Sequence, residues 1–423
     1  MKVGDSRFET LEDLGDGLSH KQKLLSRADL PIRAGTDRGE AGKRDRPGHS
    51  TSRRDFLQKA ALSSLGLAMA SAESEALCEQ SAMRNGPSAG HPLKVFCFDL
   101  NWVQLKTPIQ EFAPAAPQDW AFISPQAYFD WHKDLGVNIM FCQSYAFGGY
   151  AFYPTKLGPV APGPGRNLLP ELFKLSRKAH MPFHAYFCVG ADLIMSNMRD
   201  SWVVPTSKNE YGHWGYLAPE SPWTDLLCAR VEEFLRLYPV EWIMFDWFGY
   251  GNIEVHGLPL QPAWFVRGPF KEILGRDMPD DAAKISPQES LKYKRVILAR
   301  QFYRIREAVY KASRDTKIYF NVPYRIPAAD LWVDHPMLNE SDLLFAELES
   351  CDNVAVVEWL LKIRKPHQRV MTCLNCAPTA WKKWYERGCD FFGTVVGTPP
   401  DFRPDASYAE RLKIVRQAFR EMA

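Results

Sequence analysis

The stretch WIMFDWFGYG, from Trp242 to Gly251, determines how the rest of the chain is interpreted. It begins as a continuous apolar run, which is typical of a strand buried on both faces, and it reaches a carboxylate, Asp246, among aromatic residues. Burying an acid without a partner is costly. Asp246 is therefore either held by a hidden partner or placed at an opening where a ligand reaches it.

Similar apolar runs recur after Pro92, and amphipathic helical segments alternate with them. The eight predicted strands begin at Lys94, Asn138, Pro182, Glu241, Lys317, Asp342, Arg369 and Cys389. One predicted helix starts at Ser124-Pro125 and ends at Gly136, and others begin near Leu168, Ser221, Gln288, Asn353, Pro378 and Asp405. Parallel strands need such crossover helices, so the pattern predicts a (β/α)8 TIM barrel. An open doubly wound sheet is the alternative, but no early strand precedes a glycine-rich nucleotide-binding motif.

The composition is that of an ordinary globular protein. Of the 423 residues, 46% are hydrophobic and 24% are charged, and the formal charge of +2 is too small to indicate a nucleic-acid partner. Aromatic residues make up 13% of the chain, which is more than a typical core needs. Because sugar rings stack on flat aromatic faces, this favours a carbohydrate substrate, although core packing explains any single Trp equally well.

Residues 52–59, SRRDFLQK, precede a short apolar run and the small residues Ala70-Ser71-Ala72. This order resembles a twin-arginine export signal, and a basic turn before a short helix is the other interpretation. We expect residues 50–72 to be the signal peptide, residues 1–49 to be disordered or an over-long start assignment, and residues 73–92 to be a linker before a catalytic domain over residues 93–423. Export by the twin-arginine machinery predicts a periplasmic or secreted protein with no stable membrane anchor after cleavage.

The nine cysteines would indicate disulfides in an exported chain. Four of them nevertheless lie in apolar, strand-like runs, where a free thiol behaves as a small hydrophobe: Cys97, Cys142, Cys188 and Cys373. We therefore expect these thiols to be buried and reduced. Cys373 and Cys376 also form a lone C-x-x-C, which we interpret as two strand-end residues in preference to a redox or metal site.

Barrel enzymes carry their sites at the carboxyl ends of the strands, and nearly all of the predicted strands end on polar residues. Carboxylate, amide and aromatic groups suit a ligand rich in hydroxyls. The candidate substrate-binding residues are Asp99, Asn101, Trp102, Gln143, Tyr145, His184, Tyr186, Trp247, Asn321 and Asn375. Core packing is an equal alternative for His184 and Trp247. We expect neither a metal ion nor a cofactor.

Cleavage of a glycosidic bond needs two carboxyl groups, one protonated and one ionised. Asp246 and an acid from the run FAELE, either Glu347 or Glu349, could meet across the mouth of the barrel. Glu347 lies deeper in its strand and would be more easily desolvated, whereas Glu349 is nearer the rim and could reach a bound sugar more freely. For each acid, a salt bridge at the rim to a residue such as Arg325 or Lys106 is the structural alternative.

The segment WTDLLCARVEEFLRLYPVEWIMFDWFGYG, Trp223 to Gly251, resembles the helix–strand unit of the alpha-L-fucosidase-like glycoside hydrolases and related barrel hydrolases. In that family the Asp is the nucleophile of a retaining mechanism, and the matching position is Asp246. The resemblance implies a barrel hydrolase that acts on glycosides. Elsewhere the chain departs from the family: the first strand reads FDLNW at residues 98–102 in place of a His-rich fucose pocket, and CQSY at residues 142–145 replaces a His-His-Asp-Gly-Phe pattern. The sugar therefore stays open.

Two other functions stay open beside an exported glycoside hydrolase. A metal-dependent barrel hydrolase would suit export in the folded state, but the first strand has Asp99-Leu100-Asn101 where such an enzyme has H-x-H. A non-catalytic sugar-binding barrel would keep the aromatic residues and need no matched acids.

Overall fold

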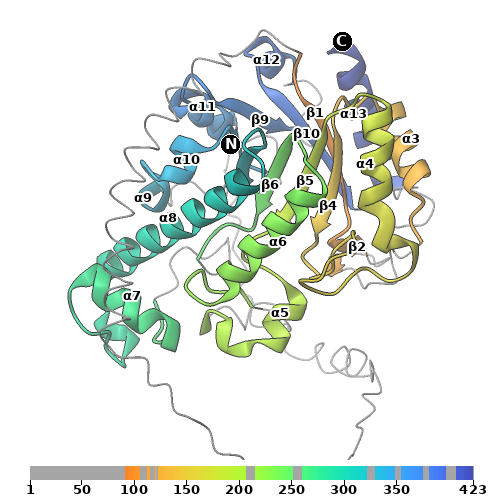
Figure 1. The fold of residues 1–423 in the computed structure, drawn as a ribbon. Coiled ribbons are helices and arrows are strands. Elements are labelled where there is room, and N and C mark those ends of the chain that lie inside the picture. Colours follow the sequence, from red (N-terminus) through yellow and green to blue (C-terminus); the bar gives the residue numbers. More distant parts are fainter. Residues whose placement is uncertain are drawn as a thin grey trace, which may run out of the picture. The chain divides into compact units, whose positions relative to one another are not determined.

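The computed structural model of the protein describes residues 91–104, 112–114, 120, 122–205, 215–250, 260–321, 329–347, 354–374, 381–396 and 406–422. Eight parallel strands form one sheet with helices around it (Figure 1). They are β1 (Lys94–Asp99), β4 (Met140–Tyr145), β5 (Phe183–Cys188), β6 (Trp242–Asp246), β7 (Lys317–Asn321), β8 (Leu343–Phe345), β9 (Arg369–Cys373) and β10 (Asp390–Val396). The eight predicted strands are all confirmed. The expected extension and signal peptide, and the linker up to residue 90, lie outside the described residues.

The strands lie in the order β1-β10-β9-β8-β7-β6-β5-β4, so β1 and β4 are the two ends of the sheet. Side chains join these ends. Oδ1 of Asn138 accepts a hydrogen bond from the N–H of Lys94 at 2.8 Å, and its Nδ2 donates to the carbonyl of Pro92 at 2.8 Å. Further along, Oε1 of Gln143 accepts from the N–H of Leu100 at 3.0 Å. The sheet thereby forms the nearly closed (β/α)8 barrel that the alternation of strands and helices predicts.

The main helices follow the strands where the sequence predicts amphipathic segments. They are α3 (Pro125–Leu135), α4 (Leu168–Lys178), α6 (Trp223–Leu237), α8 (Pro287–Ala312), α11 (Val354–Ile363), α12 (Trp381–Glu386) and α13 (Ala406–Glu421). Ser124 caps α3 by accepting from the N–H of Ala127, and Gly136 ends it with a φ of 97°. Ser286 and Glu289 form a capping box at the start of α8. Local sequence signals are therefore sufficient to define these helix ends.

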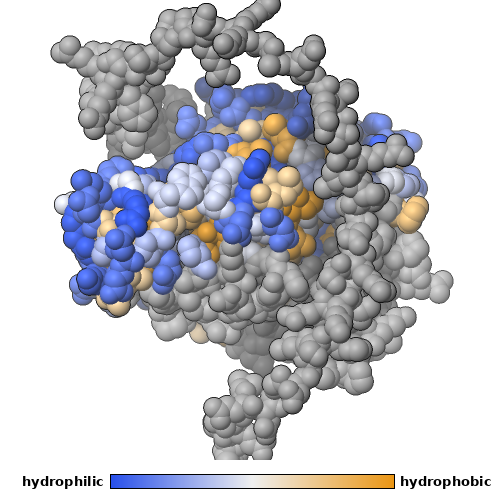
Figure 2. All heavy atoms as spheres, turned by 90° about the horizontal axis from the view of Figure 1, so that it is seen from below, coloured by the Kyte–Doolittle hydropathy of each residue, from blue (hydrophilic) through white to orange (hydrophobic). Residues whose placement is uncertain are grey.

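The loops at the carboxyl ends of the strands contain further short elements that the sequence pattern does not predict. They include β2 (Trp102–Gln104), β3 (Phe112–Pro114), α5 (Leu193–Met198), α7 (Trp264–Leu274), α9 (Ala329–Trp332) and α10 (Pro336–Glu340), with 3-10 turns at Gly163–Asn167, Asp200–Trp202 and Ala282–Lys284. α7 is hard to recognise because it contains Gly268 and Pro269, which both disfavour helix interiors. α5 and α7 lie at the lower end of the barrel in Figure 1, where the strands finish. Figure 2, seen from below, shows hydrophobic side chains near the middle of the face and hydrophilic ones toward its edges.

A ring of aromatic side chains, which we call the aromatic floor, fills the inside of the barrel. It consists of Phe141, His184, Tyr319, Phe345 and Phe392, which come from five different strands. Their ring centroids are 5.0 to 6.1 Å apart around a closed circuit, and all five residues are buried. Such a layer makes this level of the barrel interior a packed core.

Three of the cysteines predicted to be buried, Cys97, Cys142 and Cys188, are buried and free. Cys373 is half-buried and free, and Cys376 lies outside the described residues. In the part of the chain that the structure describes, no helix combines the length and the apolar character needed to cross a membrane.

Candidate active site

A layer of polar side chains lies directly above the aromatic floor. Side chains alternate along a strand, so the residue two positions after each floor residue points to the same side of the sheet. These residues are Gln143, Tyr186, Asn321, Glu347 and Thr394. Asp99 and Asp246 end β1 and β6 at the same end of the barrel. The barrel mouth thus brings together most of the polar strand ends that the sequence predicts.

Asp246 is held in this layer by three hydrogen bonds. Its Oδ2 accepts from the hydroxyl of Tyr186 at 2.8 Å, and its Oδ1 accepts from Nδ2 of Asn321 at 2.9 Å and from the N–H of Trp247 at 2.8 Å. Burial raises the pKa of Asp246, whereas the bonds from Asn321, Tyr186 and Trp247 lower it and favour the ionised form. The residue is 8% exposed, so it is largely desolvated but keeps some contact with solvent. Among the described residues, neutral donors and no salt bridge hold this carboxylate.

The hydroxyl of Tyr186 is oriented by a second set of hydrogen bonds. It accepts from Nδ2 of Asn101 at 3.3 Å, and Oδ1 of Asn101 accepts from the N–H of Phe147 at 2.7 Å. Because the hydroxyl oxygen accepts from Asn101, its hydrogen is directed to Asp246. A hydrogen-bonded chain therefore runs from the loop after β4 to Asp246.

Asn321 connects Asp246 to the second predicted acid. Its Nδ2 donates to Oε2 of Glu347 at 3.1 Å as well as to Asp246, and its Oδ1 accepts from the N–H of Glu347 at 3.0 Å. Since both carboxylate oxygens are within hydrogen-bonding distance of one nitrogen, they are no more than about 6 Å apart. We refer to this arrangement as the Asn321 bridge.

Asp99 adds a third carboxyl group to the mouth. Its Oδ1 accepts from the N–H of Asn101 at 2.9 Å and from Nε2 of Gln143 at 3.2 Å. Burial, together with a smaller effect of the charge of Asp246, raises the pKa of Asp99 to about 6, against the lowering effect of these two hydrogen bonds. Burial raises the pKa of the Cys97 thiol most, and the charges of Asp99, Glu347 and Asp246 raise it further. In the described ranges, no three His, Cys, Asp or Glu side chains are placed to hold a metal ion.

An aromatic wall, which consists of Phe147, Tyr216 and Trp247, borders Asp246. The ring of Trp247 lies 5.3 Å from that of Phe147 and 5.8 Å from that of Tyr216. Trp247 has a φ of 58°, a left-handed conformation that is uncommon outside glycine and recurs at functional sites. Gly190 permits this arrangement, because a Cβ there would lie 2.4 Å from the carbonyl oxygen of Trp247.

Two predicted substrate-binding residues lie away from the polar layer. His184 belongs to the aromatic floor, where burial lowers its pKa to about 3 and neither ring nitrogen has a hydrogen-bond partner among the described residues. Tyr145 packs in the layer between β4 and α6, where the guanidinium of Arg230 lies 4.2 Å from its ring centroid. The cause is a shift of register in β4 between Gln143 and Tyr145, which interrupts the alternation of side chains.

Several predicted residues lie outside the described part of the chain: Glu349, Asn375, Arg325 and Lys106. For Trp102 the structure describes only the backbone, in β2.

Sequence analysis missed Phe147 and Gly190. Phe147 follows β4 in an apolar run and has no feature that marks it as part of a site. Gly190 could have been found, because a lone glycine directly after a strand often marks a close approach of two backbone segments.

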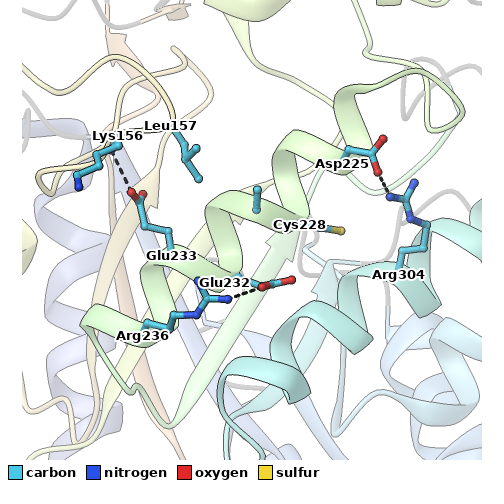
Figure 3. Close-up of a pocket in the computed structure, with 9 residues that line it drawn as sticks. Lys156, Leu157, Asp225, Cys228, Glu232, Glu233, Arg236 and Arg304 are labelled. Carbon is cyan, nitrogen blue, oxygen red and sulfur yellow. Dashed lines mark hydrogen bonds and ion pairs between the residues drawn. The ribbon is translucent and has the colours of Figure 1, made fainter. Parts of the chain in front are cut away.

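A hollow of about 490 Å³ lies beside α6, away from the polar layer (Figure 3). It is bordered by charged residues of α6 and α8 that pair with one another. Arg236 contacts Glu232 at 2.6 Å, and Arg304 pairs with Asp225. Because these charges are mutually satisfied, the polar layer at the strand ends is the better candidate for an active site.

No protein-family model matches the sequence, and no curated protein matches it. Solved structures do match. Alpha-L-fucosidase isoenzyme 2 from Paenibacillus thiaminolyticus aligns with a TM-score of 0.57 and 14% identity, over 78% of this chain and 49% of its own. The chain is similar in fold to this alpha-L-fucosidase. It spans about half of the fucosidase's length (49%).

An alpha-L-fucosidase from Lactobacillus casei, solved with its alpha-L-fucose product, aligns with a TM-score of 0.38 and 12% identity, over 71% of this chain and 80% of its own. The Paenibacillus similarity confirms the (β/α)8 barrel. One fold hosts many activities, so the chemistry has to be argued from the site itself.

Proposed function

We propose that this protein is a glycoside hydrolase in which Asp246 is the nucleophile of a retaining mechanism. The observation that supports this most is the Asn321 bridge, which keeps one oxygen of Asp246 and one of Glu347 no more than about 6 Å apart. The two carboxyl groups of retaining glycosidases are about 5–5.5 Å apart, and those of inverting enzymes about 6.5–9.5 Å. The bridge favours the shorter spacing, in which a carboxylate attacks the sugar directly.

The proposed first step breaks the glycosidic bond. Oδ2 of Asp246 accepts one hydrogen bond and Oδ1 accepts two, so Oδ2 has more electron density free for attack on the anomeric carbon. As the new carbon–oxygen bond forms, the bond to the leaving oxygen breaks, and that oxygen takes a proton from Glu347. In the second step Glu347 takes a proton from water, the water oxygen attacks the anomeric carbon, and Asp246 leaves with its electron pair. The product keeps the original anomeric configuration.

The aromatic wall and Asp99 support a carbohydrate substrate in this scheme. Trp247 offers an aromatic face beside the nucleophile, and Asp99 offers an acceptor for sugar hydroxyls across the mouth. The fold shared with alpha-L-fucosidases makes alpha-L-fucosides the first substrates to test. We further propose that the protein is exported, on the strength of the twin-arginine pattern at residues 52–59.

The test is turnover of a panel of aryl glycosides, including an α-L-fucoside, a β-galactoside and an α-glucoside, with NMR detection of the first anomer released. The parent is compared with Asp246→Asn, with Glu347→Gln and with Glu349→Gln. We expect release with retained configuration, a loss of at least about a thousandfold in Asp246→Asn, and a large loss in Glu347→Gln. If no glycoside is cleaved, or the first product is inverted, the proposal is wrong.

A further inference from the structure

A buried ion pair lies behind the mouth, between α6 and the loop after β5. Nη1 of Arg230 donates to Oδ2 of Asp192 at 2.8 Å, and the two side chains are 1% and 3% exposed. Removing such charges from water is costly, and apolar residues of the same volume often stabilise a fold equally well. Stability alone therefore does not account for the burial of this pair.

Arg230 fastens the ends of β4 and β5 to α6. Its Nε donates to the carbonyl of Leu157, in the loop after β4, at 3.2 Å. Its guanidinium lies 4.2 Å from the ring centroid of Tyr145 and 5.2 Å from that of Trp223. Trp223 in turn donates its indole N–H to the carbonyl of Val189, directly after β5, at 2.6 Å. One cation thus fixes two neighbouring strand ends.

Asp192 extends this constraint to the aromatic wall. Gly149, in the loop after β4, packs so closely that a Cβ there would lie 2.4 Å from Oδ1 of Asp192. Leu193, the residue after Asp192, donates its N–H to the carbonyl of Phe147 at 2.9 Å. The ring of Phe147 lies 5.3 Å from that of Trp247. A displacement of Asp192 would therefore move the aromatic wall.

A second ion pair, in which the acid is buried and the arginine is half-buried, lies at the other end of the barrel and provides a contrast. Nε and Nη2 of Arg369 donate to the two carboxylate oxygens of Asp390 at 2.6 and 2.5 Å, and Asp390 is 0% exposed. These residues begin β9 and β10, so the pair lies where the strands start. That end of a barrel serves stability, whereas the other end carries the site.

We propose that Arg230 and Asp192 are positioning residues, whose ion pair sets the place of the aromatic wall relative to Asp246 and so controls how tightly a sugar ring is held. The predicted effect on KM rests on the proposed function. The structural claim, that the pair holds Phe147 and Trp247 in place, does not.

The experiment compares two matched variants in which both charges of a pair are removed, D192N/R230M and D390N/R369M. For each we would determine a crystal structure, the midpoint of thermal unfolding, and kcat and KM on the glycoside that the parent cleaves fastest. Both should unfold at lower temperature than the parent. Only D192N/R230M should displace the rings of Phe147 and Trp247 and raise KM at least about tenfold, because only that pair is connected to the wall. R230K keeps the charge but loses the planar donor group, so it should raise KM less than D192N/R230M does.

An unmoved wall in the D192N/R230M crystal structure, or an equal change of KM in the two variants, would overturn the proposal and leave both pairs with a structural role. If D192N/R230M does not fold, R230K is examined in the same way, and an unchanged wall with an unchanged KM overturns the proposal. If the parent cleaves no glycoside, the proposed function fails, and the position of the two rings still decides the positioning claim.

Discussion

Tyr186 donates its hydroxyl hydrogen to Oδ2 of Asp246 at 2.8 Å, and both residues are buried. A hydrogen bond to a charged acceptor contributes about 1.5–3 kcal/mol, and this one stabilises the ionised carboxylate against the effect of burial. It connects a predicted substrate-binding residue on β5 to the predicted nucleophile on β6. The reactivity of Asp246 should therefore depend on its neutral neighbours.

Replacing Tyr186 by Phe should raise the pKa of Asp246, because the ionised form loses a donor. We expect the acidic limb of the pH profile of kcat/KM to move up by about one pH unit and kcat/KM at its optimum to fall at least about tenfold. Tyr319→Phe is the matched control, since the Tyr319 hydroxyl has no hydrogen-bond partner among the described residues. An acidic limb that stays in place in Tyr186→Phe contradicts this role.

Replacing Asn321 by Ala removes the Asn321 bridge. Asp246 would then lose a donor that favours its ionised form, so its pKa would rise and a larger fraction of the nucleophile would be protonated. We expect kcat/KM to fall about a hundredfold, as when a donor to developing charge is removed. Asn138→Ala, which alters the join between β1 and β4 at the start of the strands, should lower the unfolding temperature and leave kcat/KM of the folded enzyme near the parent value. Equal kcat/KM values in the two variants would contradict a role of the Asn321 bridge in catalysis.

Asp99 should make stability depend on pH. Its pKa in the folded protein is about 6, above the ordinary value of 3.8, so the folded state binds this proton more tightly than the unfolded chain does. Stability should therefore fall as the pH rises from about 4 through 6. Asp99→Asn removes this loss, and we expect it to increase the free energy of unfolding at pH 7 by at most about 3 kcal/mol, with little effect near pH 4. Urea unfolding of parent and variant across this range tests the expectation, and a difference that does not vary with pH would contradict it.

Gly190→Ala should disturb the aromatic wall. The added Cβ would lie 2.4 Å from the carbonyl oxygen of Trp247 and 2.9 Å from the ring of Tyr216. We expect about 1–3 kcal/mol of lost stability from overpacking, together with a KM raised about tenfold or more. At Gly268, inside α7, a Cβ meets nothing within 4 Å, so Gly268→Ala should be neutral or slightly stabilising. Unfolding midpoints and KM values of the two alanine variants test this expectation. A KM of Gly190→Ala equal to that of the parent would contradict a role of the aromatic wall in holding the substrate.

The fold could be predicted because its signals are local. The apolar runs define the eight strands, and residues such as Ser124 and Gly136 mark helix ends within a few positions of the chain. α7 could not be predicted in this way, because Gly268 and Pro269 oppose its local signal and packing against the rest of the chain decides its state.

The members of the site could be predicted in part, but their contacts could not. Asp246, Tyr186 and Asn321 are strand ends, which the alternation of side chains places at the mouth. The hydrogen bonds among them join residues 60 and 75 positions apart, and no local pattern carries that information. Tyr145 shows the limit of alternation, since one shift of register in β4 moved its side chain to the helix layer.

The most direct test of the central claim is to trap the intermediate on Asp246. A glycosyl fluoride of the preferred sugar, with a second fluorine beside the anomeric carbon to slow hydrolysis, would be incubated with the parent and with Asp246→Asn, followed by mass spectrometry of the intact protein and its peptides. We predict one added fluorosugar on the peptide that contains Asp246, and none on that peptide in the variant. Turnover of the parent substrate without any adduct, or an adduct on a different residue, would contradict the assignment of Asp246 as the nucleophile.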